Sequence, residues 1–247
     1  MTQRLFLVTP AEWGAAATGD LVVVTGAEAR HAVQVVRLAV GEQVLVSDGA
    51  GRRASGEIMA AEPLRLTVRL ARIEDVPEPS PRFVLVQALA KGDRDEQAVE
   101  AATELGVDVV VPWQASRSIV RWRADKADKG RQKWVAVVTA AAKQARRARI
   151  PVVERVERMP GVRARVEAAT VALVLHEDAT TPLAGLELPA SGDVVLVVGP
   201  EGGIAPEELQ ALVGAGAQVV RLGPEVLRSS SAGPAALAVL NAASRWR

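Results

Sequence analysis

The chain has 247 residues, of which 49% are hydrophobic and 24% charged, and its net charge is +1, so disordered, collagen-like and coiled-coil proteins are excluded. It contains no cysteine and only two histidines, which excludes disulfides, thiol catalysis, cysteine-bound zinc and histidine-rich metal sites. No apolar run approaches the roughly 18 residues of a membrane helix, and the first residues lack the apolar core of a signal peptide. We therefore expect a cytoplasmic protein that binds neither metal nor membrane.

The first part of the chain predicts a small β-rich domain. Short β-branched runs punctuated by glycine are typical of a barrel or sandwich, and they lie at 21–26, 41–51, 56–60 and 64–73. Between the first two runs, residues 27–38 (AEARHAVQVVRL) predict a helix with Ala32, Val35 and Val36 on one face.

A proline-rich segment marks the expected domain boundary. Residues 73–81 (IEDVPEPSP) contain three prolines, so this segment is stiff, extended and unable to join a central strand. We predict one domain over residues 1–72, a linker over 73–81 and a second domain over 82–247.

The second domain alternates apolar strands with helices. The expected strands are residues 83–89, 107–112, 150–156, 170–175, 193–198 and 218–222. Asp93 and Glu96 have the spacing of a capping box at the start of a helix that ends near Gly106, and further helices are expected at 131–148, from 206 and at 231–244. This alternation predicts an α/β fold, a parallel sheet with helices on both faces.

The charge is uneven along the chain. Residues 117–149 contain eleven Lys and Arg against two Asp, a net charge of +9, whereas the rest of the chain is acidic. Trp122 and Trp134 are interleaved with these basic residues. One interpretation is a solvated helix surface, and the other is a surface that contacts nucleic-acid phosphates.

Three unusual loops follow three of the expected strands, at residues 176–182, 199–208 and 222–233, and the last two are rich in glycine or serine. In open parallel sheets ligands bind beyond the carboxyl ends of the strands, so these loops predict a small-molecule site. The GPEGG sequence in the second loop allows close backbone approach to a ligand, although it also suits a tight turn. The serines of the third loop also suit a helix cap. Phosphate-binding P-loop and serine-hydrolase motifs are absent.

Two of these loops carry the motif of a known family. VVLVVGPEGGIAPEEL and VVRLGPEVLRSSSAGPAALAVLNA resemble the carboxyl-terminal signature of the SPOUT RNA methyltransferases. HAVQVVRLAVGEQVLVSDGAG, KGDRDEQAVEAATELGVDVVVPWQASRSIVRW and KQARRARIPVV extend the resemblance over nearly the whole chain. The resemblance is to the bacterial 16S ribosomal RNA uracil-N3 methyltransferase family (RsmE).

This resemblance implies a fold, an activity and partners. The expected fold is an RNA-binding PUA-like β-barrel followed by a SPOUT methyltransferase domain, whose chain forms a deep trefoil knot. The expected activity is transfer of the methyl group of S-adenosylmethionine to N3 of one uridine in 16S ribosomal RNA of the 30S subunit. The family works as a homodimer.

Matching the motifs residue by residue implies the site. The resemblance places the cofactor against Leu175, His176, Glu177, Gly199, Pro200, Glu201, Gly202, Gly203, Leu222, Gly223, Leu227, Arg228 and Ser229. The residues expected to bind RNA combine the family's Q-x-x-R-x-R pattern, two barrel arginines and the basic run: Arg4, Arg37, Arg117, Arg121, Gln144, Arg146, Arg147 and Arg149.

Two departures from the family pattern affect the chemistry. Glu225 replaces an arginine, and three serines from Ser229 replace a Thr-Glu-Thr triplet, so Ser230 stands where the family has an acid. We therefore predict that Arg228 stabilises the uracil anion, with Glu201 as the weaker candidate for a general base. The alternatives are a SPOUT enzyme with another target atom, such as a 2′-hydroxyl, and a non-catalytic ribosome assembly factor.

Overall fold

The structure, a computed structural model, describes residues 3–246 apart from the side chains at 124 and 125. Within this range the chain forms two compact units. The first comprises the chain up to Glu78 together with Ala142–Ile150, and the second comprises Pro79–Ala141 together with the chain from Pro151. The boundary between the two units at Glu78 and Pro79 falls inside the predicted linker, 73–81. The sequence did not predict that residues 142–150 belong to the first unit.

The first unit is built on a five-stranded sheet with the strand order β1-β3-β4-β5-β2. Its strands are β1 (Leu5–Leu7), β2 (Leu21–Thr25), β3 (Gln43–Ser47), β4 (Arg52–Glu62) and β5 (Arg65–Asp75). The pairs are antiparallel except β1 with β3. Alternate residues of the strands, such as Val44 and Val46, are fully buried, so one face of the sheet makes the core. Two short helices, α1 (Pro10–Trp13) and α2 (Gly26–Arg30), complete the unit.

The predicted helix over residues 27–38 is only partly correct. It consists of α2 and one π-helical turn, His31–Val35, in which the amide of Val36 donates to the carbonyl of His31 at 2.9 Å. Ala32 is buried as predicted, but 67% of Val35 is exposed. The wider π turn changes the angle between successive side chains, and the apolar face expected from an α-helical period is lost.

The segment 142–150 pairs with the first sheet. The amide of Ile150 donates to the carbonyl of Gly49 at 2.9 Å, and the amide of Gly51 donates to the carbonyl of Ala148 at 3.1 Å. The buried hydroxyl of Ser47 also donates to the carbonyl of Ala148, at 3.1 Å. These bonds join residues about a hundred positions apart, which explains why local patterns did not reveal them.

The second unit contains a seven-stranded parallel sheet in the order β10-β12-β9-β11-β6-β7-β8. Its strands are β6 (Arg82–Ala88), β7 (Val109–Trp113), β8 (Val152–Val153), β9 (Val171–Leu175), β10 (Thr181–Pro182), β11 (Asp193–Val198) and β12 (Gln218–Arg221). The predicted parallel sheet is confirmed, and β10 is an additional short strand. The trefoil knot stays a prediction.

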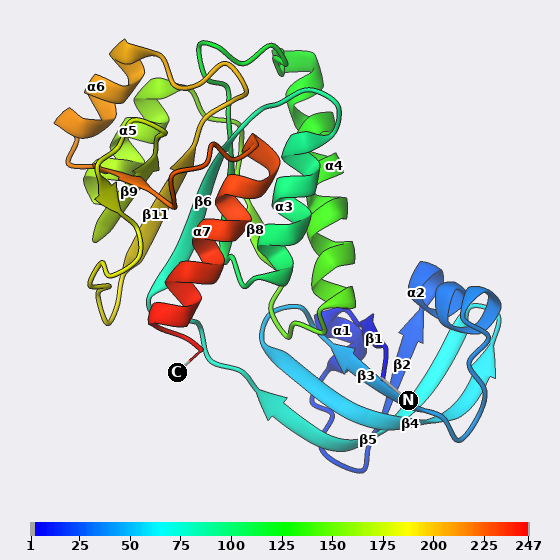
Figure 1. Ribbon diagram of the computed structural model, residues 1–247. Coiled ribbons are helices and arrows are strands. Elements are labelled where there is room, and N and C mark those ends of the chain that lie inside the picture. Colours follow the sequence, from blue (N-terminus) through cyan, green and yellow to red (C-terminus); the bar gives the residue numbers. More distant parts are fainter. Residues whose placement is uncertain (1–2, 247) are drawn as a thin grey trace. The chain divides into compact units, whose positions relative to one another are not determined.

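Helices cover both faces of this sheet, as the alternation predicted (Figure 1). They are α3 (Arg94–Glu104), α4 (Ala124–Gln144), α5 (Met159–Ala168), α6 (Pro206–Gly214) and α7 (Ser229–Ala243). Val84 and Val86 share a core with Val162 of α5 and Leu212 of α6, while Leu85 lies on the opposite face, where it contacts Gly233 of α7. None of the helices in the described part of the chain has the length and hydropathy of a membrane span.

Two predicted helix caps are wrong. Asp93 has a left-handed backbone and makes no cap, because its carboxylate instead accepts from Lys133 at 3.3 Å. The buried carboxylate of Asp95 accepts from the amide of Ala90 at 3.2 Å, and burial raises the pKa of Asp95. At α7 the N-cap position is Arg228, and no serine side chain caps the helix.

Arg82 and Asp193 join the first residues of β6 and β11 by two hydrogen bonds of 2.7 and 2.8 Å. These bonds to Arg82 hold the pKa of Asp193 below its ordinary value of 3.8. The folded state therefore favours the ionised form, so its stabilisation is present at neutral pH and is lost as the pH falls below that value. Because the pair is largely solvated, Asp193→Asn should cost at most about 1 kcal/mol at pH 7. Urea unfolding should show that the difference between the variant and the parent shrinks progressively as the pH is lowered below 3.8.

Candidate functional site

The three predicted loops meet at one edge of the second sheet. They follow β9, β11 and β12, which are neighbours with parallel register, so their carboxyl ends lie together. The loops enclose a cavity of about 850 Å³. Every residue that the sequence assigned to the cofactor lines this cavity, together with Arg94, Asp178, Ile204, Arg221 and others that the sequence did not indicate.

The part of the second loop that precedes α6, residues 199–205, is folded tightly against the cavity. The amide of Gly203 donates to the carbonyl of Pro200 at 2.9 Å, and the φ of Gly203 is +72°, a conformation that favours glycine. A Cβ atom at Gly199 would lie 2.7 Å from Cγ1 of Ile204. The loop therefore requires glycine at these two positions, and this requirement fixes the conformation of one wall of the cavity.

Glu201 is held at the side of the cavity by a neighbouring loop. Its Oε1 accepts from the backbone amide of Lys91 and from Nη1 of Arg94, both at 3.1 Å. These bonds join the second loop to the segment that follows β6. Because the carboxylate already has an amide and a guanidinium as partners, the geometry favours a positioning role over the role of a mobile base.

Arg94 is a residue that sequence reasoning missed. It begins α3, after the short loop 89–93 that follows β6, and β6 is paired with β11 in the sheet. The position of β6 next to β11 was the missing information, since carboxyl ends of adjacent parallel strands share one edge.

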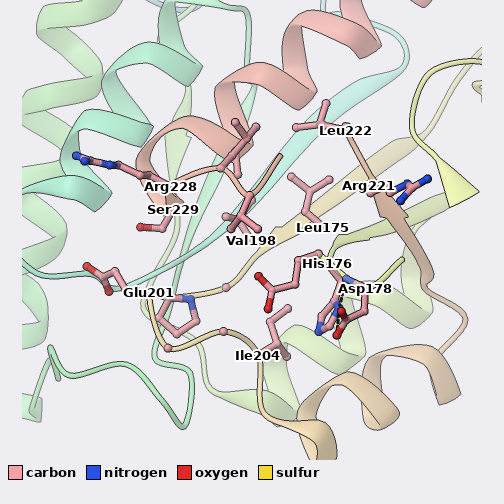
Figure 2. A pocket seen from close by; sticks show the side chains of 18 of the residues that line it. Leu175, His176, Asp178, Val198, Glu201, Ile204, Arg221, Leu222, Arg228 and Ser229 are labelled. Carbon is pink, nitrogen blue, oxygen red and sulfur yellow. Dashed lines mark hydrogen bonds and ion pairs between the residues drawn. The ribbon is translucent and has the colours of Figure 1, made fainter. Parts of the chain in front are cut away.

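Arg228 lies at the start of α7, where its carbonyl accepts from the amides of Ser231 and Ala232, both at 2.9 Å. Its side chain is exposed and has no hydrogen-bond or ion-pair partner within the described residues. Ser229 is buried beside it, and its hydroxyl also lacks a partner within residues 3–246. Figure 2 shows Arg228, Ser229 and Glu201 on one side of the cavity and His176 on the other. One side of the cavity therefore carries a guanidinium and a hydroxyl that have no partner in the described part of the chain.

His176 is oriented by its own loop. Its backbone amide donates to the carbonyl of Val220 at 3.0 Å, and its Nδ1 accepts from the amide of Asp178 at 3.2 Å. The ring is thus fixed at the rim by local bonds, which explains its position without assigning it a catalytic role.

Two of the residues predicted to bind RNA lie in the second unit. Arg117 lines the cavity, and its Nη1 donates to the carbonyl of Gly202 at 3.0 Å. Arg121 is exposed and donates to the carbonyl of Ser116 at 3.3 Å. The structure therefore brings Arg117, which was expected only at the RNA surface, into contact with the second loop.

The other predicted RNA residues lie in the first unit. Arg4, Arg37, Gln144 and Arg146 are exposed, and Arg147 is partly buried. Arg149 differs from them, because its guanidinium donates to the carbonyl of Val76 at 2.9 and 3.1 Å and to that of Pro77 at 3.2 Å. These bonds give Arg149 a structural role that the sequence did not predict.

The two arginines Arg146 and Arg149 should therefore respond differently to substitution. Arg149→Ala should lower the free energy of unfolding by about 1–3 kcal/mol, because backbone carbonyls lose a charged donor. Arg146→Gln should change it by less than about 0.5 kcal/mol. If Arg146 contacts a phosphate, its variant should also reduce the slope of log affinity for RNA against log salt by about 0.7–0.9. Equal losses of stability in the two variants would contradict this division.

Two family descriptions match the chain. Residues 77–241 match an RNA methyltransferase domain, and residues 24–71 match an RNA methyltransferase PUA domain. The fold is therefore a PUA-like domain followed by an α/β methyltransferase domain.

Curated relatives match along most of their length. The chain is 46% identical over 234 residues to ribosomal RNA small subunit methyltransferase E of Mycobacterium tuberculosis, covering 93% of this chain and 89% of the relative. It is 27% identical over 226 residues to the Bacillus subtilis protein of the same name, covering 88% of each.

Solved structures share the whole fold. Ribosomal RNA small subunit methyltransferase E from Neisseria gonorrhoeae, bound to S-adenosylmethionine, is 26% identical and superposes with a TM-score of 0.83 over 98% of each chain. A Legionella pneumophila protein in complex with the same cofactor is 28% identical, again with a TM-score of 0.83 over 98% of each chain.

Proposed function

This chain belongs to the ribosomal RNA small subunit methyltransferase E family, and on that premise we propose that it methylates N3 of a uridine in 16S ribosomal RNA. The methyl donor is S-adenosylmethionine, bound in the cavity between the three loops. The observation that carries this proposal is the meeting, at one sheet edge, of every residue that the family motif assigns to the cofactor.

The cavity fits this cofactor in size and in chemistry. A volume of about 850 Å³ lies within the range of cofactor pockets. Gly199 is packed against Ile204 with no room for a Cβ atom, so this wall of the cavity has a fixed conformation. The hydroxyl of Ser229, which has no partner among residues 3–246, and the backbone of the second loop supply polar groups for a nucleoside and an amino-acid moiety.

The residues of this chain must orient the uracil and favour its anion. When bound, the cofactor supplies an electrophilic methyl group. N3 of uracil carries a proton that it must lose before it can act as a nucleophile, and the negative charge then spreads to the neighbouring oxygens. Arg228, whose guanidinium is always charged and has no partner in the described part of the chain, stabilises that charge.

Glu201 has a different role in this proposal. Its bonds to Lys91 and Arg94 hold the second loop in place, so it positions the cofactor wall. The proton of N3 then passes to solvent, because Ser230 occupies the position of the family acid.

The partners follow from the same premise. The substrate is 16S ribosomal RNA within the 30S subunit, in the cytoplasm, and the exposed arginines of both units contact its phosphates. We expect a homodimer, since the family works as one. Sedimentation at micromolar protein should give about twice the 26.0 kDa of the chain, and a 26.0 kDa species would contradict the dimer.

The test is incorporation of labelled methyl from S-adenosylmethionine into small subunits that lack the modification. We expect stable incorporation, unaffected by a metal chelator. A non-catalytic assembly factor would bind the subunits without incorporation, and this result would overturn the proposal.

A further inference from the structure

Residues 116–122, here called the Arg117 loop, are anchored at both ends. At the first end, the amide and the hydroxyl of Ser116 donate to the two carboxylate oxygens of Glu208, at 2.9 and 2.8 Å. At the other end, the amide of Trp122 donates to Oε1 of Gln114 at 3.0 Å. The loop therefore holds its shape through bonds within the second unit.

Arg117 joins this loop to the second loop of the cavity. Its Nη1 donates to the carbonyl of Gly202 at 3.0 Å, and a Cβ atom at Gly202 would lie 3.4 Å from Cβ of Arg117. Arg117 forms no ion pair within residues 3–246. Because a guanidinium has five N–H donors and one is used here, Arg117 has donors left for an anionic ligand.

Glu208 makes a second connection between the Arg117 loop and the second loop of the cavity. Glu208, in the first turn of α6, is only 8% exposed and also accepts from the amide of Ala205 at 3.4 Å. Its carboxylate therefore links Ser116 to Ala205, the residue of the second loop that directly precedes α6. With the Arg117 contact, the Arg117 loop is bonded to the second loop at two points.

The same segment also presents basic side chains to solvent. Arg121 and Arg123 are exposed within six residues of Arg117. We propose that Arg117 is a positioning residue that couples RNA binding to cofactor binding, and this inference rests on the proposed function. A phosphate bound at the Arg117 loop fixes Arg117, which fixes the carbonyl of Gly202 and the loop that contacts the cofactor.

Coupling of this kind is reciprocal. If RNA raises the affinity for the cofactor by some factor, the cofactor raises the affinity for RNA by the same factor, and such factors are commonly about 5 to 150. The physical source is the pair of connections between the two loops, since a ligand that fixes Arg117 also favours one position of the Gly202 carbonyl.

The experiment measures the affinity of the full chain for unmethylated small subunits, with and without saturating S-adenosylhomocysteine, which cannot donate a methyl group. We expect the parent chain to bind at least about 5-fold more tightly with the cofactor product present. Arg117→Ala should reduce this factor to less than 2-fold, and Arg117→Lys should restore part of it, because lysine can also donate to the Gly202 carbonyl. Calorimetry without RNA should show that Arg117→Ala still binds S-adenosylhomocysteine.

Arg123→Ala is the matched control, because Arg123 is exposed directly after the Arg117 loop and its side chain has no partner within the described residues. It should weaken subunit binding equally with and without the cofactor product, leaving the factor unchanged. If Arg117→Ala behaves like Arg123→Ala, Arg117 is a simple phosphate contact and the proposal is overturned. A parent chain that binds subunits without any coupling would also overturn it. A parent chain that binds no subunits at all would instead refute the proposed function, and this proposal with it.

Discussion

Arg228→Ala is expected to lower turnover at least 100-fold, even at saturating cofactor. The reason is that the variant removes a charged donor from the place where negative charge develops on the uracil, and loss of one such donor typically costs about 100- to 1,000-fold. The backbone of residue 228 still begins α7, because that role uses its carbonyl and not its side chain. Single-turnover measurement with small subunits as substrate checks this expectation.

Glu201→Gln is the variant that distinguishes stabilisation of the uracil anion by Arg228 from general base catalysis by Glu201. Glutamine can keep an oxygen acceptor for the amide of Lys91 but loses the ion pair with Arg94, so we expect turnover to fall far less than in Arg228→Ala. Turnover should be measured against pH in both variants. A large loss in Glu201→Gln that is rescued at high pH would contradict the assignment and indicate a carboxylate base.

Gly199→Val is expected to weaken S-adenosylmethionine binding by at least about 100-fold. Even a Cβ atom at this position would lie 2.7 Å from the side chain of Ile204 and 3.3 Å from its backbone nitrogen, so the second loop cannot keep its conformation. Calorimetry with the cofactor checks the loss of affinity.

Two further variants test the cause of that loss. Gly214→Ala, at the end of α6, meets no atom within 4 Å and should keep the parent affinity. Gly199→Ala should weaken binding, and adding Ile204→Ala, which removes the clashing side-chain atom, should restore part of it. Full affinity in Gly199→Val would show that the cofactor does not bind at this loop.

The sequence predicted the parts of the fold that depend on local pattern. The apolar runs that became β6, β9 and β11 were visible because strands of a parallel sheet are buried on both faces. The three loops of the cavity followed from the rule that ligands bind at the carboxyl edge of such a sheet.

The incorrect or missing predictions for Asp93, Arg149 and Arg94 share one physical cause, which is contact between residues that lie far apart in the sequence. Asp93 was expected to cap a helix, but Lys133, forty residues away, binds its carboxylate. Arg149 was expected to face RNA, but its donors bind carbonyls at Val76 and Pro77. Arg94 was missed because only the strand order brings β6 beside β11.

The most direct test of the central claim is the identity of the methylated atom. Unmethylated small subunits should be incubated with this protein and S-adenosylmethionine, and their 16S RNA should be digested to nucleosides and analysed by mass spectrometry against standards. We predict one new nucleoside, N3-methyluridine. A methyl group on a 2′-hydroxyl or on another base, in place of N3-methyluridine, would contradict the claim.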